Sequence, residues 1–147
     1  IFLARMGHEK ESIRKYCIDT FQYELRQTVD DIRPHYAFDV SCQGSVPQAI
    51  ISFLDGEDFE DTIRNAISLG GDSDTIAAMA GSIAEAHYGS VPASIQDGIF
   101  MRLSRDIKDV IKQFRNVQSS KAWVIFIWDV WVENTHTGRK WVENLSG

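Results

Sequence analysis

The stretch that decides the fold begins with Gly70-Gly71-Asp72-Ser73-Asp74-Thr75 and continues as IAAMAGSIAEA through residue 86. The paired glycines let the backbone turn sharply, and two carboxylates and two hydroxyls then follow within four residues. Small residues recur after them at helical spacing, so we expect a helix from Asp74 to Tyr88 that ends at Gly89. Hard oxygen donors gathered at a helix start are the ligands that Mg²⁺ prefers.

The same four polar residues also have an ordinary structural interpretation. Asp and Ser are preferred N-caps, and acids in a first turn interact favourably with the helix dipole. Two features favour a bound cation: the glycines allow another group to approach the backbone, and the small-residue helix fits a deeply buried position. Acidic side chains at the start of a buried helix are costly without a counter-ion. Capping and cation binding therefore stand as alternatives.

Up to about residue 115, the chain reads as short helices joined by tight turns, which is typical of an all-α fold. Residues 35–44 are expected to form a loop. The expected helices cover residues 9–19, Thr28 to Arg33-Pro34, Ser45 (with Pro47 in its first turn) to Asp55-Gly56, Asp58 to about residue 69, Pro92 to Leu103, and residues 107–114.

Residues 116–147 differ in composition from the rest. The run WVIFIWDVWV (residues 123–132) is β-branched and aromatic, and residues 134–138 could turn it back as a β-hairpin. We therefore divide the chain into a helical part, residues 1–115, and an aromatic-rich tail of uncertain origin, residues 116–147. The four tryptophans are expected to pack a hairpin or an interface, with sugar stacking as the alternative.

Composition excludes several classes of protein. A chain of 147 residues with 44% hydrophobic and 24% charged residues is typical of one soluble globular domain. The net charge of -6, without a basic stripe, argues against a nucleic-acid partner, and the apolar run is too short for a membrane span. Two cysteines indicate neither a disulfide framework nor a zinc cluster, so we expect a cytoplasmic location. Because the sequence begins at Ile1 like the tail of an earlier helix, we expect an upstream half to be missing.

Several ordered segments together resemble the ADP-ribosylglycohydrolases, relatives of the dinitrogenase-reductase-activating glycohydrolase. The GGDSDTIA motif, followed by GSIAEA and Tyr88-Gly89, looks like the C-terminal signature of that family. TVDDIRP (28–34), SCQGSVPQAI (41–50) and DFEDTIRNAI (58–67) are similar to segments that precede it. The resemblance covers roughly residues 5 to 115 and implies the C-terminal part of an all-α, orthogonal multi-helix bundle.

The resemblance also implies a site for two Mg²⁺ or Mn²⁺ ions. In the family pattern the second Asp of the motif bridges both ions, and this role falls on Asp74. The first Asp and the Thr ligate one ion, which places those roles on Asp72 and Thr75.

Other site residues follow from the same resemblance. The loop at residues 42–46 lies near the ligand in the family, so Gln43, Gly44 and Ser45 are expected to contact substrate. Gly70 and Gly71 are expected to line the same site.

The remaining metal ligands of the family come from a Thr-Asp-Asp triplet in the N-terminal half, as does an acidic residue that assists the chemistry. This chain contains neither, so no catalytic residue is identified in it. Asp30 and Asp31 follow Val29 rather than a threonine, and we interpret them as exposed acids on a short helix.

Two weaker candidates have structural explanations. His35 with Ser41 or Ser45 lacks a third orienting group for nucleophilic catalysis, so we expect a helix cap and a loop histidine. His87 lies about 20 Å along its helix from Asp74 and is expected to pack or to lie on the surface.

The sequence supports two functions from different classes. The first is a metal-dependent hydrolase that cleaves the glycosidic bond between ADP-ribose and a protein side chain or small molecule; this chain alone would then be inactive. The second is a non-catalytic helical module that binds ADP-ribose or a partner chain. A separate chain that supplies the N-terminal half would reconcile the missing ligands with activity.

Overall fold

Helices alone build the part of the chain that a computed structural model describes, residues 1–119. The chain divides into two units, one from Ile1 to Gln96 and one that starts at Asp97. The predicted all-α fold is confirmed over the described residues. The predicted hairpin and the four tryptophans fall in residues 120–147, outside them.

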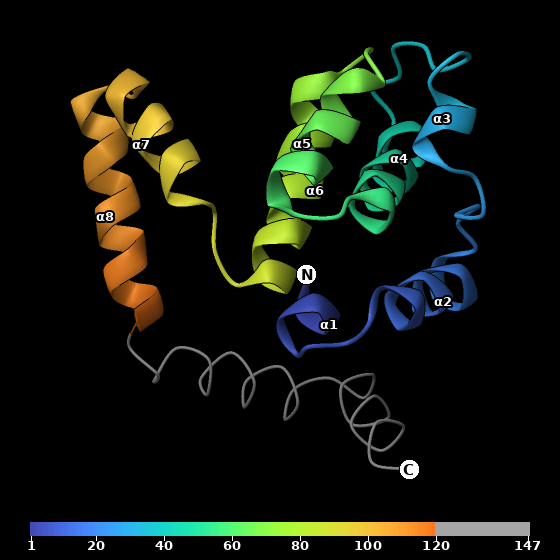
Figure 1. Cartoon of the computed structure of the whole chain (residues 1–147), viewed down its shortest axis with the longest axis horizontal. Coiled ribbons are helices and arrows are strands. Elements are labelled where there is room, and N and C mark those ends of the chain that lie inside the picture. The colour runs from blue at the N-terminus through green and yellow to red at the C-terminus, as the bar shows by residue number, and fades with distance from the viewer. Residues whose placement is uncertain (120–147) are drawn as a thin grey trace. The chain divides into compact units, whose positions relative to one another are not determined.

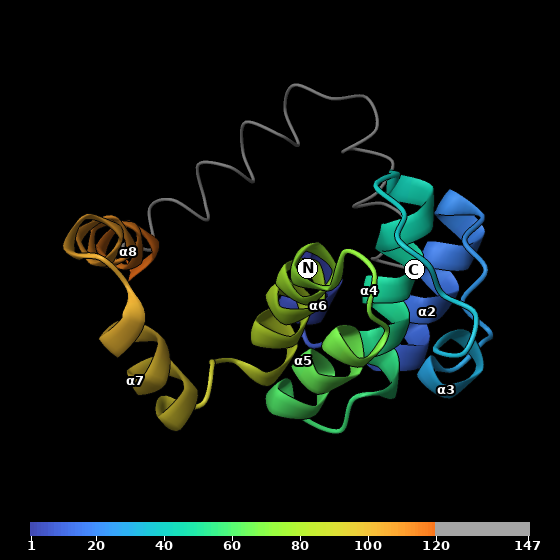
Figure 2. The same cartoon turned by 90° about the horizontal axis from the view of Figure 1, so that it is seen from above.

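Three helices form the centre of the first unit. Helices α4 (Cys42–Asp55), α5 (Phe59–Ser68) and α6 (Ser73–Tyr88) each pack against the other two (Figures 1 and 2). The shorter helix α1 (Phe2–Arg5) contacts α6, and α2 (Lys10–Phe21) and α3 (Val29–Ile32) contact α4. The largest fully buried apolar side chains come from α4, α6 and the segment before α3: Leu25, Ile51, Phe53 and Ile76.

Local capping explains where several helices begin and end. The Thr28 side chain accepts a hydrogen bond from the Asp31 N–H, and the Asp31 side chain accepts one from the Thr28 N–H, which is a capping box. Asp58 caps α5 by accepting from the N–H three residues later at 2.8 Å. Gly56 ends α4, and Gly89, with φ 88°, ends α6. These four boundaries confirm the predictions.

Helix α4 begins four residues earlier than predicted. Ser41, not Ser45, is its N-cap and accepts from the Gly44 N–H at 3.0 Å. Ser45 is buried, and its hydroxyl donates to the Ser41 carbonyl at 2.8 Å. Pro47 therefore lies inside the helix, where it offers no N–H to the carbonyl of Gln43 four residues before it.

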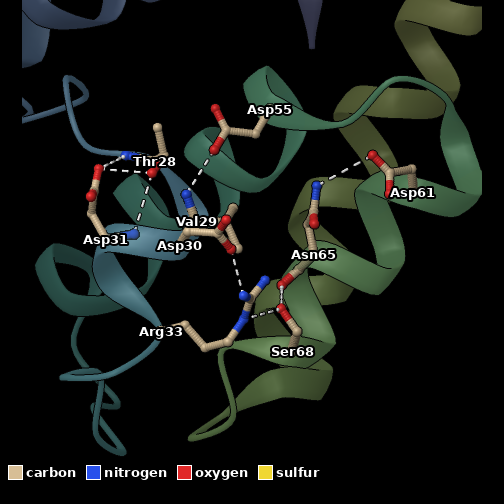
Figure 3. A network of polar contacts seen from close by, with 9 residues as sticks. All are labelled: Thr28, Val29, Asp30, Asp31, Arg33, Asp55, Asp61, Asn65 and Ser68. Atoms are coloured by element: carbon tan, nitrogen blue, oxygen red, sulfur yellow. Dashed lines mark hydrogen bonds and ion pairs between the residues drawn. The ribbon is translucent and has the colours of Figure 1, made fainter.

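Side-chain hydrogen bonds tie the short helix α3 to its neighbours (Figure 3). The Val29 N–H donates to the Asp55 carboxylate at the end of α4, at 2.7 Å. Arg33, which follows α3, pairs with Asp30 and donates from Nε to the Ser68 hydroxyl at the end of α5, at 3.0 Å. Asp31 thus caps α3 and Asp30 pairs with Arg33. Both are exposed acids on a short helix, as predicted.

The last two described helices are α7 (Ala93–Arg102) and α8 (Arg105–Ser119). The Arg115 guanidinium lies over the Phe100 ring, 5.5 Å from its centroid. Helix α8 runs past the predicted boundary at residue 115, and the division into a helical part and a tail stays a prediction. Each helix within residues 1–119 is too short or too polar to cross a membrane.

Candidate functional site

The turn before α6 depends on two glycines in the left-handed region. Gly70 has φ 74° and Gly71 has φ 59°, a conformation that side chains disfavour. A Cβ on Gly71 would also lie 2.8 Å from Cε1 of Tyr36 and 3.3 Å from the Ala37 carbonyl oxygen. A Cβ on Gly70 would have nothing within 4 Å. Backbone conformation therefore favours a glycine at both positions, and close packing favours it further at Gly71.

Asp72 occupies the N-cap position of α6 without acting as a cap. Its side chain makes no capping hydrogen bond, whereas the side chains of Thr28, Ser41 and Asp58 each accept one from a backbone N–H. Asp72 also has φ -82° and ψ 55°, unlike the extended backbone of those three caps. The capping alternative thus does not account for this carboxylate.

Asp74 and Thr75 lie exposed in the first turn of α6, beside the half-buried Asp72. Within residues 1–119, no hydrogen bond or ion pair engages the side chains of these three residues. Two carboxylates and a hydroxyl therefore stand without protein partners at the positive end of a helix dipole. Their oxygens remain available to a ligand.

Helix α6 is less buried than its small residues predicted. One face packs into the core through Ile76, Ala80, Gly81 and Ala84. The other face is exposed among the described residues, because α1, α4 and α5 contact only part of the helix. This exposed face comprises Asp74, Thr75, Ala78, Ser82 and Glu85.

The start of α4 presents its three expected substrate residues in different ways. Gln43 is exposed, while the buried Ser45 uses its hydroxyl within the helix. The Gly44 carbonyl accepts a hydrogen bond from the Tyr36 hydroxyl at 2.9 Å. A Cβ on Gly44 would overlap the carboxylate of Asp39. Of the three, Gln43 has the accessible side chain.

Tyr36 shows that the starts of α4 and α6 are neighbours. Its hydroxyl bonds to Gly44, and its ring edge lies against Gly71. Burial raises the pKa of the Tyr36 phenol, and the negative charges of Asp39 and Asp72 raise it further. The structure therefore brings Gly44 and the Gly70–Asp72 turn together around one tyrosine.

Sequence reasoning missed both Tyr36 and Asp39. Asp39 had a local signal, because its carboxylate accepts from the Ser41 N–H two residues later at 2.8 Å, as Asp commonly does in turns. The Ser41 hydroxyl and N–H lower the pKa of this exposed carboxyl. Tyr36 had no local signal, since its contacts depend on the tertiary fold.

The donor chemistry of α6 fits a hard divalent cation. Carboxylate and hydroxyl oxygens are the preferred ligands of such ions. However, no group of three His, Cys, Asp or Glu side chains converges on a metal position within residues 1–119. Asp72, Asp74 and Thr75 thus suit one side of a metal site, and the described residues do not complete it.

The two weaker candidates have structural roles. Ser41 is the cap of α4, and His35 lies in the turn after α3, as expected. The His87 ring packs edge-on against Phe53 and Tyr88, with centroids 5.2 and 5.0 Å away. Of the two roles expected for His87, packing or a surface position, the structure shows packing.

Comparison with known proteins supports the resemblance. A family model described as ADP-ribosylglycohydrolase matches residues 6–122. The ADP-ribosylhydrolase ARH3 of Danio rerio is 42% identical over 82 residues, covering 47% of this chain and 22% of its own length. An uncharacterized protein of Archaeoglobus fulgidus is 37% identical over 60 residues, covering 41% of this chain and 20% of its own length.

The chain thus spans about a fifth of the length of these two relatives. No solved structure matches it significantly. The family match includes the Gly70–Thr75 motif, the start of α4 and all helices from α2 to α8. The chain belongs to the ADP-ribosylglycohydrolase family.

Proposed function

We propose that this chain carries one side of the divalent-metal site of an ADP-ribosylglycohydrolase. The whole site would hydrolyse the glycosidic bond between ADP-ribose and a protein side chain or small molecule. One observation carries the proposal: Asp72 stands at an N-cap position without capping, beside Asp74 and Thr75, which also lack protein partners within residues 1–119. Family membership supports the reaction class.

Each polar residue of the α6 start has a role in this proposal. Asp74 would bridge two Mg²⁺ or Mn²⁺ ions, while Asp72 and Thr75 would complete the shell of one. When bound, such ions supply charge stabilisation and orient ribose hydroxyls and water. The turn at Gly70 and Gly71 would place the carboxylates of Asp72 and Asp74 side by side at the start of α6.

The reaction itself is a displacement by water. The water oxygen bonds to the anomeric carbon, the glycosidic C–N or C–O bond breaks, and the leaving atom gains a proton while the attacking water loses one. We assign no general acid or base to this chain. The acid and the remaining ligands would come from a Thr-Asp-Asp-containing N-terminal half, so the 147 residues alone should bind metal weakly and show no appreciable turnover.

Calorimetry with Mg²⁺ and ADP-ribose tests the proposal. The wild-type chain should bind ADP-ribose in a Mg²⁺-dependent manner, and Asp74→Asn should abolish that dependence. Glu85→Gln is the matched control, because Glu85 is an exposed acid on the same helix but near its other end.

Three other results would distinguish the partial metal site from the alternatives. Metal-independent binding of ADP-ribose that Asp74→Asn leaves unchanged would support the non-catalytic binding module. Efficient cleavage of ADP-ribosyl-arginine or ADP-ribosyl-serine by the 147 residues alone would contradict the partial site. Turnover that appears only after mixing with a chain that supplies the N-terminal half would support it.

A further inference from the structure

Tyr36 lies at the meeting point of three segments that are far apart in the sequence. Its backbone N–H donates to the Ile32 carbonyl at 3.0 Å, which attaches it to the end of α3. Its hydroxyl donates to the Gly44 carbonyl in the first turn of α4. Its ring packs against Gly71, directly before the α6 N-cap. The half-buried side chain therefore spans the distance between two helix starts.

The segment that precedes Tyr36, from Thr28 to Arg33, is bonded to the ends of α4 and α5. The capping box at Thr28 fixes the start of α3, and the bond from the Val29 N–H to Asp55 fixes α3 to the end of α4 (Figure 3). Three residues before Tyr36, Arg33 bonds to Ser68, two residues before Gly70. The segment after α3 thus holds the glycine turn from both sides: through Arg33 before the turn and through Tyr36 at Gly71.

The charges around Tyr36 are compatible with a lasting hydrogen bond. The Tyr36 hydroxyl donates to the Gly44 carbonyl, and burial raises the pKa of the phenol, as do the negative charges of Asp39 and Asp72. Asp39 is held in place by hydrogen bonds from Ser41. The ring thus has an acidic group from the loop and an acidic group of the site within electrostatic reach.

We propose that Tyr36 is a positioning residue of the site. It fixes the Gly70–Asp72 turn against the first turn of α4, and thereby sets where the Asp72 carboxylate stands relative to Gln43. The proposal rests on the proposed function, because it treats Asp72 as a metal ligand. Tyr36 itself donates nothing to the ion or to the substrate.

Two substitutions separate the contributions of the hydroxyl and the ring. Tyr36→Phe removes the hydrogen bond to Gly44 but keeps the ring against Gly71, whereas Tyr36→Leu removes both. Tyr23→Phe is the control, because Tyr23 is also a partly buried tyrosine packed on the core, in the segment between α2 and α3. All measurements use the full 147-residue chain.

The first measurement is amide hydrogen exchange, which needs no metal. Tyr36→Phe should speed exchange at the amides of Gly70 and Ile76, which donate to the carbonyls of Ile67 and Asp72 on either side of the turn, by about three- to tenfold relative to the core helices; this corresponds to one lost hydrogen bond. Tyr36→Leu should speed it further, and Tyr23→Phe should leave it unchanged. Unchanged exchange at Gly70 and Ile76, or an equal increase throughout α4, α5 and α6, would overturn the proposal.

The second measurement is Mn²⁺ affinity, followed by electron paramagnetic resonance. Tyr36→Phe should weaken Mn²⁺ binding by about three- to tenfold, and Asp74→Asn should abolish it. If Asp74→Asn abolishes binding while both Tyr36 variants bind like wild type, the positioning role is refuted and the metal site stands. If the wild-type chain binds no Mn²⁺, the proposed function fails, and the exchange rates at Gly70 and Ile76 still decide whether Tyr36 holds the turn.

Discussion

Replacing Gly71 with alanine should destabilise the first unit more than the same replacement at its neighbour Gly70. Both glycines have positive φ angles, 74° at Gly70 and 59° at Gly71. Only at Gly71 would the new Cβ meet other atoms: Cε1 of Tyr36 at 2.8 Å, with the Ala37 carbonyl oxygen and Phe38 Cα each at 3.3 Å. The pair therefore separates the cost of conformation from the cost of packing.

The expected magnitudes follow from these two contributions. A left-handed backbone conformation costs an L-residue about 1–2 kcal/mol, which is the whole effect expected for Gly70→Ala. Overpacking adds about 1–3 kcal/mol at Gly71, because the Tyr36 ring is held by its hydrogen bond to Gly44 and backbone atoms must also move. Gly71→Ala should thus lower the free energy of unfolding by about 2–5 kcal/mol. The smaller conformational freedom of alanine in the unfolded chain affects both variants equally.

Urea unfolding followed by circular dichroism at 222 nm measures the difference between the two variants. Gly71→Ala should have the lower midpoint at an unchanged slope. Combining Gly71→Ala with Tyr36→Ala should recover part of the loss, because the closest obstacle to the new methyl group is removed. Equal destabilisation by the two single substitutions, or a larger effect at Gly70, would refute the packing of Tyr36 on the turn.

Three further predictions concern other parts of the first unit. Thr28→Ala should lower the free energy of unfolding by about 1 kcal/mol in urea titrations, because the capping box of α3 is lost; no change would argue against that cap. Hydrogen bonds lower the pKa of the Asp31 and Asp39 carboxyls, so their stabilising effect should be complete above about pH 4 and disappear as the pH falls through their folded-state values. Urea midpoints measured between pH 2 and 7 check this. In the double variant Asp31→Asn, Asp39→Asn, the urea midpoint should fall less at acidic pH than it does in the wild type. Iodoacetamide should label the exposed Cys42 under native conditions and spare Cys17, whose thiol is buried with a raised pKa; equal labelling on mass spectrometry would contradict the core.

Much of the fold could be predicted because its boundaries are local. Thr28 and Asp58 precede amphipathic segments and cap them through bonds within the same turn. Gly89 ends α6 because a left-handed residue is easiest for glycine. Such signals depend on neighbouring residues only, so the sequence contains them completely.

The predicted start of α4 at Ser45 was wrong because two local signals for a helix start compete in this segment. Ser45 followed by Pro47 is typical of a helix start, yet Ser41 caps the helix and the Ser45 hydroxyl bonds back to the Ser41 carbonyl. That bond and the burial of Pro47 place both residues inside a longer helix. The choice depends on packing of α4 against the rest of the unit, which the local pattern does not contain.

The candidate site was predictable in its residue types but not in its surroundings. The motif predicts Asp72, Asp74 and Thr75 as metal ligands with capping as the alternative, and the structure shows that the Asp72 side chain makes no capping hydrogen bond. The roles of Tyr36 and Asp39 depend on contacts between segments that lie far apart in the sequence. Only the folded chain brings Gly44 and Gly71 to the same ring.

Paramagnetic broadening by Mn²⁺ in a proton–nitrogen correlation spectrum of the full chain tests the central claim most directly. Substoichiometric Mn²⁺ should broaden the amide signals of residues 70–76 first, followed by those at the start of α4, and Asp74→Asn should remove the effect. Signals of Glu85 and the end of α6 should persist, because they lie about 16 Å or more along the helix from Asp74. Broadening centred on other acidic residues, or the same broadening in wild type and Asp74→Asn, would contradict a metal site at the start of α6.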